Sequence, residues 1–240
     1  MQEICAVIAA GGLGTRLKDY KDNKSTKVLI QIENMSMISS QIEQIFQWGV
    51  KKFIVITNPE FDELIRKDIH NNHSSKDINF AIQHTPSGIA HALLQVEKLI
   101  KKDLKILFVL GDNFFGENPL KEIDFNKKIN SKIFVKNVEN PKDFGVLEIQ
   151  NKELINIIEK PKNPKSNMAV VGIYLYDPDC FKYIKQLKPS NRGELEITDL
   201  NNLLISKKLL DYKELNSWWI DAGTEERIEE LKKLLNNFHT

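Results

Sequence analysis

The stretch Ala9-Ala10-Gly11-Gly12-Leu13-Gly14-Thr15-Arg16 decides the fold, and an apolar run from Ile4 to Ala10 leads directly into it. β-Branched residues that end at a glycine cluster predict a buried first strand. The three glycines allow positive φ and a close approach of backbone to a ligand, and successive N–H groups in such a loop bind anions. Arg16 adds donors suited to phosphate. The stretch therefore predicts a phosphate-binding loop at the carboxyl end of a parallel strand.

This loop does not match the two best-known glycine-rich phosphate motifs. No Gly-Lys-Ser/Thr closes it, which excludes the P-loop pattern, and no acidic residue is clearly placed about 20 residues on, which disfavours a nicotinamide-dependent oxidoreductase. From the loop alone, a tight strand-to-loop turn without a ligand stays open as an alternative.

Composition bounds the class of protein. The chain has 240 residues, with 34 basic and 33 acidic side chains and a formal net charge of +1. This length suits a single α/β domain, and the balanced charge gives no electrostatic reason to bind nucleic acid or a membrane surface. Cys5 and Cys180 lie far apart in the sequence, so we expect buried free thiols that bind no metal, and a cytoplasmic location. We find no signal peptide and no run of 18 apolar residues.

Hydrophobic periodicity predicts strands that alternate with helices. We expect strands at 53–57, 78–83, 104–110, 133–138, 145–149, 154–158, 169–176, 209–215 and 217–220. We expect helices around 38–46, which Ser36 caps, and at 61–69, 90–100, 181–187 and 200–205, with a last helix after Thr224. The order indicates an α/β fold with a doubly wound, mostly parallel central sheet (a Rossmann-like layer) and a smaller β-rich part.

Two polar residues next to apolar segments are candidates for chemistry. Asp112 follows the central strand and faces the crevice where α/β ligands bind, and a carboxylate there suits Mg²⁺. A turn-forming Asp-Asn pair is the alternative. Lys27 opens a short apolar segment, and a solvated surface lysine is the alternative for it. Gly172 lies inside a predicted strand, where we expect a ligand to approach closely.

Taken together, these features resemble the sugar-phosphate nucleotidylyltransferases, most closely the members that transfer a thymidylyl group. The resemblance covers nearly the whole chain and is most specific in the run from Arg192 to Asp199. The matching runs are 10–16, Lys27, Gln83 with Gly88, 110–113, 144–146, 159–161, 171–172, 188–199 and 219–223. The resemblance implies attack of a sugar-1-phosphate oxygen on the α-phosphorus of a nucleoside triphosphate, with release of pyrophosphate. It further implies a role in polysaccharide biosynthesis and assembly into a homo-oligomer.

The resemblance also implies a role for each matching residue. Arg16, Lys27 and Asp112 match the catalytic positions, and Asp112 with Asp221 matches the Mg²⁺ ligands. The positions that match the nucleotide site are Gly11, Gly12, Gly14, Thr15, Arg16, Gln83 and Gly88, of which Gln83 reads a pyrimidine edge and Gly88 leaves room for the base. The positions that match the sugar-phosphate site are Gly145, Glu159, Lys160, Val171 and Arg192.

The family pattern divides the single domain into a nucleotide-binding half, 1–115, and a sugar-phosphate-binding half, 116–240. One departure concerns the base, because the family often has a glutamine where this chain has Val28. UTP or CTP, and another sugar-1-phosphate, therefore stay open as substrates. A regulatory subunit that binds nucleotide-sugars without turnover is disfavoured, because the catalytic positions are all present.

Overall fold

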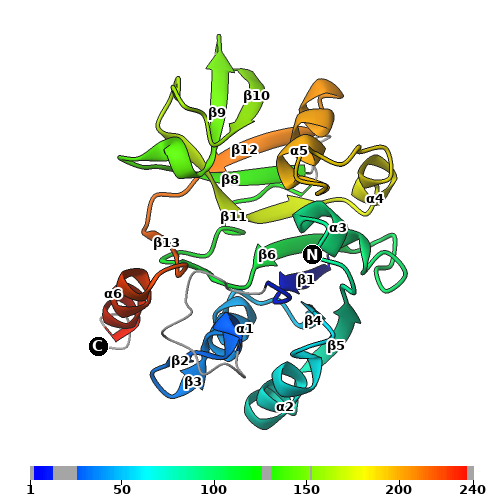
Figure 1. The fold of residues 1–240 in the computed structure, drawn as a ribbon, viewed down its shortest axis with the longest axis vertical. Helices are drawn as coiled ribbons and strands as arrows, with labels where there is room; N and C mark the ends of the chain where they lie inside the picture. Colours follow the sequence, from blue (N-terminus) through cyan, green and yellow to red (C-terminus); the bar gives the residue numbers. More distant parts are fainter. Residues whose placement is uncertain (1–2, 13–25, 126–130, 152, 237–240) are drawn as a thin grey trace.

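Four parallel strands form the centre of the molecule. The computed structural model describes residues 3–12, 26–125, 131–151 and 153–236 (Figure 1). The strands β1 (Ile4–Ala9), β4 (Lys52–Thr57), β5 (Asp77–Ile82) and β6 (Lys105–Leu110) lie in the order β6-β1-β4-β5. Since β1 is flanked on both sides, its residues are buried almost throughout, as expected for the middle of a parallel sheet.

The sheet continues as an antiparallel part beyond β6. The strand β11 (Met168–Tyr176) pairs antiparallel with β6, with β8 (Ser131–Asn137) and with β9 (Gly145–Gln150). The strand β10 (Glu153–Glu159) forms a hairpin with β9, and β12 (Leu210–Glu214) extends the sheet next to β8. This confirms the predicted α/β fold with a mostly parallel core and a β-rich part.

Helices cover both faces of the sheet. Side chains of β1 alternate between two apolar cores: Ala6 and Ile8 pack with α1 (Met37–Gln47) and α2 (Asp62–His73). Cys5 and Val7 pack on the other face with α3 (Ile89–Leu94), α4 (Cys180–Ile184) and α5 (Ile197–Ser206). Because side chains alternate along a strand, β1 contributes to the apolar cores on both faces of the sheet.

A small two-stranded sheet joins distant parts of the sequence at one end of the parallel strands. The strand β13 (Trp219–Asp221) pairs antiparallel with β7 (Asn113–Phe115), which sets Asp221 opposite Asn113. A third apolar core packs β7 and β13 against α6 (Glu225–Asn236). Four short elements complete the described fold: the 3₁₀ turns Lys27–Leu29 and Pro141–Asp143, and the strands β2 (Gln31–Ile32) and β3 (Met35–Ser36).

Local signals mostly predict the element ends correctly. The hydroxyl of Ser36 accepts a hydrogen bond from the Ser39 N–H and caps α1, as predicted. The helix predicted at 90–100 is wrong in length, because α3 ends at Leu94. Turns follow it, with hydrogen bonds between residues three positions apart, such as Val96 N–H to the Leu93 carbonyl at 3.3 Å.

Both cysteines are buried free thiols, as predicted, and burial is the main reason that the pKa of Cys5 rises to about 12. Within the described residues we find no helix with the length and hydropathy needed to cross a membrane.

Candidate active site

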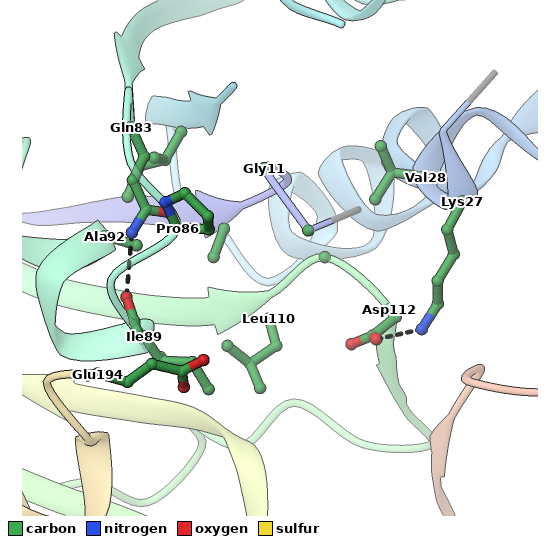
Figure 2. Close-up of a pocket in the computed structure, with 15 residues that line it drawn as sticks. Gly11, Lys27, Val28, Gln83, Pro86, Ile89, Ala92, Leu110, Asp112 and Glu194 are labelled. Atoms are coloured by element: carbon green, nitrogen blue, oxygen red, sulfur yellow. Dashed lines mark hydrogen bonds and ion pairs between the residues drawn. The ribbon is translucent and has the colours of Figure 1, made fainter. Parts of the chain in front are cut away.

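The first cavity lies where β1, β5 and β6 end. Its volume is about 330 Å³, within the usual range for small-molecule sites. The sequence-predicted residues that line it are Gly11, Gly12, Lys27, Gln83, Gly88 and Asp112. Gln83 and Pro86 lie at one end of the cavity, and Lys27 and Asp112 lie at the other (Figure 2). The fold thus gathers residues separated by up to about a hundred positions into one cavity, with its charged pair at one end.

Lys27 and Asp112 form an ion pair at the charged end. Lys27 begins a 3₁₀ turn, Lys27–Leu29, and its ammonium donates to Asp112 Oδ2. Only 13% of the Lys27 side chain and 27% of the Asp112 side chain are exposed. The alternative of a solvated surface lysine is therefore wrong. A buried cation beside a carboxylate is an arrangement suited to an anionic ligand and a metal ion.

The loop after β5 forms the opposite end of the cavity. Gly88 has a φ of 101°, and a Cβ there would collide with the carbonyl oxygen of Leu195. Ala90 N–H donates to the same carbonyl at 3.1 Å, and Leu195 N–H donates to Ser87 at 2.8 Å. The glycine is required for this close packing between two loops, which is a different reason from the predicted room for a base. The packing brings Glu194 to the cavity wall.

A second cavity of about 490 Å³ adjoins the first, and Ile89 and Leu110 line both. The predicted sugar-phosphate residues Gly145, Glu159 and Lys160 line it, together with Asp221. It also contains Gly172, Tyr174, Asn201, Trp219 and Arg227. Burial raises the pKa of Tyr174, and the carboxylate of Glu159 adds to this, so its phenol stays a neutral group.

The second cavity orients its carboxylate by hydrogen bonding. Thr198 on α5 donates from Oγ1 to Glu159 Oε2 at 2.7 Å. A Cβ at Gly145 would lie 3.3 Å from the same oxygen, so the glycine leaves room for the carboxylate. Lys160 follows with a φ of 46°, a conformation that is uncommon outside glycine and concentrates at functional sites.

Val171 and Val170 lie on opposite faces of β11. The side chain of Val171 is fully buried in the apolar core beneath α1, whereas Val170 lines the second cavity. Since side chains alternate along a strand, Val171 itself can face a ligand in this cavity only through its main chain.

Asn113 connects the metal-ligand candidate to two strands, and the sequence prediction did not assign it a role. Its Nδ2 donates to Asp112 Oδ1 at 2.7 Å, and its Oδ1 accepts from Gly172 N–H at 3.1 Å and from Trp219 Nε1–H at 2.7 Å. Only 3% of Asn113 is exposed. The signal that could have revealed it is its place directly after Asp112 at the end of a buried strand.

Asn113 is a close neighbour of Gly172, and the close approach of a ligand that we expected at Gly172, which lines the second cavity, stays a prediction. A Cβ at Gly172 would lie 2.6 Å from Asn113 Oδ1. The missing side chain lets the Asn113 amide sit against the β11 backbone.

The fold brings Asp112 and Asp221 together. Ala222 N–H donates to the Asp112 carbonyl at 2.8 Å, and Asp221 pairs with Asn113 across β7 and β13. Asp112 lines the first cavity and Asp221 the second, and two carboxylates supply hard oxygen donors that fit Mg²⁺, which commonly takes one or two protein carboxylates and completes its shell with phosphate and water. Among the residues that the structure describes, no group of three or more His, Cys, Asp or Glu could hold a metal.

Besides Val171, four predicted residues are not among those that line these cavities. Gly14, Thr15 and Arg16 lie outside the described residues. Arg192 lines neither cavity: its Nη2 donates to Glu196 Oε2 at 2.9 Å, and 57% of its side chain is exposed. A contact between Arg192 and a phosphate stays a prediction.

Comparison with known proteins decides the family. The model of a family described as nucleotidyl transferase matches residues 5–237. The chain belongs to this family. It is 36% identical over 232 residues to a glucose-1-phosphate thymidylyltransferase of Neisseria meningitidis serogroup A, covering 93% of this chain and 80% of that protein.

Two further proteins are similar to this nucleotidyltransferase. A UTP–glucose-1-phosphate uridylyltransferase of Haloferax volcanii is 29% identical, with 96% of both chains covered. A crystal structure of a candidate glucose-1-phosphate thymidylyltransferase from Bacillus anthracis, with sucrose bound, superposes with a TM-score of 0.87 at 37% identity, covering 96% of this chain and 94% of that one. The predicted family, its enzymatic class and its fold are confirmed.

Proposed function

We propose that this nucleotidyltransferase joins a nucleoside monophosphate from dTTP to glucose-1-phosphate and releases pyrophosphate. The observation that carries the proposal is that two cavities adjoin, one lined by the Lys27–Asp112 pair and the other by Asp221, so that two phosphorylated substrates could lie next to each other near these charges. The substrate names come from the thymidylyltransferase relatives. In this reading the first cavity takes the triphosphate and the second takes the sugar phosphate. The division into halves 1–115 and 116–240 stays a prediction, since Glu194 lines the first cavity and Ile89, Leu110 and Asn113 line the second.

The proposed chemistry needs charge neutralisation and positioning more than proton transfer. A sugar-phosphate oxygen, already anionic at neutral pH, forms a bond to the α-phosphorus, and the bond to the pyrophosphate oxygen breaks. Lys27 neutralises charge on the α-phosphate as that charge develops. When bound by Asp112 and Asp221, Mg²⁺ would supply further charge stabilisation at the phosphates. Glu159, held by Thr198, accepts hydroxyl hydrogens of the sugar and fixes its orientation.

The choice among pyrimidine triphosphates is the least constrained part of the proposal. Val28 lines the first cavity where many family members carry a glutamine, and one relative is a uridylyltransferase. UTP is therefore the second candidate donor. Val28 removes one polar contact near the nucleotide and leaves Gln83 as the amide at the base end.

The test is pyrophosphate release with Mg²⁺ and glucose-1-phosphate across dTTP, UTP, CTP, GTP and ATP. We expect the largest kcat/KM with dTTP and a loss of roughly 10²–10³-fold in Lys27→Ala, the size typical for removing one charge-stabilising group. Lys67→Ala is the matched control, because Lys67 is exposed on α2 away from both cavities. Absence of release with every triphosphate and with other sugar phosphates would overturn the proposal.

A further inference from the structure

The amide of Gln83 is held from two sides. Its Nε2 lies 3.1 Å from the carbonyl oxygen of Gly88 and 3.1 Å from Nδ1 of His91. Gln83 follows β5 and lines the first cavity, whereas His91 lies in α3 behind the loop. Both partners of the amide therefore belong to the protein, and His91 is not among the residues that line the cavity.

The hydrogen-bonding capacity of these groups decides which way the amide points. A carbonyl oxygen can only accept, so the side of the Gln83 amide that meets Gly88 must be its nitrogen. The same nitrogen meets His91 Nδ1, which therefore accepts as well, and the proton of the neutral imidazole is on Nε2. The two N–H hydrogens of Gln83 are then both used.

Neighbouring contacts hold His91 in place. Gln95, one helical turn later, donates from Nε2 to the His91 carbonyl at 2.9 Å. The start of α3 is fixed by the bond from Ala90 N–H to the Leu195 carbonyl. The distance between Gln83 and His91 is thus set by backbone packing rather than by the two side chains alone.

Resting on the function proposed above, we propose that His91 is a positioning residue for base recognition. It holds the Gln83 amide in one orientation and leaves Oε1 as the polar atom that Gln83 offers to the base. Within the described part of the chain, no donor is hydrogen-bonded to this oxygen. Gln83 therefore acts as an acceptor alone, although a free amide could donate as well.

An acceptor at this place selects among pyrimidines. Thymine and uracil carry an N–H at N3 in the middle of the edge, whereas cytosine has a lone pair there. Oε1 accepts from the first two and faces the lone pair of the third. Because the contact does not involve the C5 position, it does not distinguish thymine from uracil. The orientation set by His91 therefore favours both dTTP and UTP over CTP.

The experiment compares His91→Leu with His91→Gln. Leucine removes one of the two acceptors that hold the Gln83 nitrogen and leaves only the Gly88 carbonyl, so the amide turns more readily and its nitrogen can face cytosine; glutamine keeps an acceptor near Gln83. Binding of UTP and of CTP is measured by calorimetry without sugar phosphate, and kcat and KM are then measured with glucose-1-phosphate. We expect the UTP-to-CTP affinity ratio to fall about tenfold in His91→Leu and to recover in His91→Gln, with the kinetic change mainly in KM.

Two further variants separate this role from a general structural one. His84→Leu is the matched control, because His84 is exposed next to Gln83 and outside the cavity lining, and we expect an unchanged ratio. In a Gln83→Leu background, His91→Leu is expected to change the ratio no further. An unchanged ratio in His91→Leu, or stronger binding of CTP than of UTP by the unmodified enzyme, overturns the proposal. Absence of turnover alongside a normal binding ratio would instead overturn the proposed function.

Discussion

The two cavities adjoin but are built in different ways. The first lies at the carboxyl ends of parallel strands, and its walls combine glycine backbone with one charged pair and one amide. The second lies over antiparallel strands, and side-chain hydrogen bonds from Thr198, Asn113 and Trp219 order its groups. A phosphate chain needs backbone N–H groups and charge, whereas a sugar needs several oriented acceptors and donors. The construction of each cavity thus agrees with the ligand that we assign to it.

The largest effect is expected at Asp221, which lines the second cavity and lies close to Asp112 in the fold. Asp221→Asn preserves size but removes a negative charge from the candidate Mg²⁺ site, so we expect kcat to fall roughly 10²–10³-fold and half-saturating Mg²⁺ to rise. Paramagnetic Mn²⁺ binding gives a readout that does not depend on turnover. A melting temperature close to that of the unmodified protein would show that the fold is intact. Near-normal kcat at ordinary Mg²⁺ would remove Asp221 from the site.

The next largest effect is expected when the packing between Gly172 and Asn113 is disrupted. In Gly172→Ala the new Cβ would lie 2.6 Å from Asn113 Oδ1, so we expect the Asn113 amide to move, Asp112 to lose its hydrogen bond from Asn113 while keeping Lys27, and stability to fall by roughly 1–3 kcal/mol. A double-mutant cycle with Asn113→Ala measures the coupling by chemical denaturation and by kcat. Gly172→Ala should cost much less once Asn113 is already alanine; equal costs in both backgrounds would contradict the collision.

A smaller effect should separate the cavities kinetically. Thr198→Val removes the hydrogen bond to Glu159 Oε2, worth about 1 kcal/mol, so KM for the sugar phosphate should rise about fivefold while KM for the triphosphate stays unchanged. Thr198→Ser keeps the hydroxyl and should behave as the unmodified enzyme. Ser206→Ala, at the far end of the same helix, is the control. A parallel rise in both KM values would show that the cavities are not independent.

The smallest effect concerns a site remote from both cavities. His73 lies between α1 and α2, where its Nε2 meets the Ser39 carbonyl at 2.9 Å, and burial is the main cause that lowers its pKa. The unfolded chain takes up this proton near pH 6.5 and the folded chain does so only at lower pH. Stability should therefore fall as the pH drops below about 6.5. His73→Gln should flatten this dependence in denaturant titrations and leave kcat and KM unchanged; an unaltered pH dependence would exclude His73 as its source.

Sequence reasoning predicted well what depends on neighbouring residues. The buried parallel strands, the Ser36 cap and the placement of Asp112 after a strand are local patterns, and the family motifs added Lys27, Gln83 and Glu159 to the cavities in which they are found. Sequence reasoning predicted less well why glycine is needed at particular positions. Gly88 and Gly172 each make room for another part of the same chain, and such partners are invisible until the distant segments are placed.

The alternation of apolar runs and turn residues by itself determined a doubly wound sheet with phosphate-binding chemistry at its carboxyl edge, because burial of apolar strands and glycine-rich turns act over a few residues. Only the tertiary structure decided how these groups work together. It paired Lys27 with Asp112, set Asp221 beside Asn113, and fixed the Gln83 amide against His91. Hydrogen bonds and ion pairs of this kind need atoms about 3 Å apart, and only the folded chain brings segments that are many residues apart to that distance.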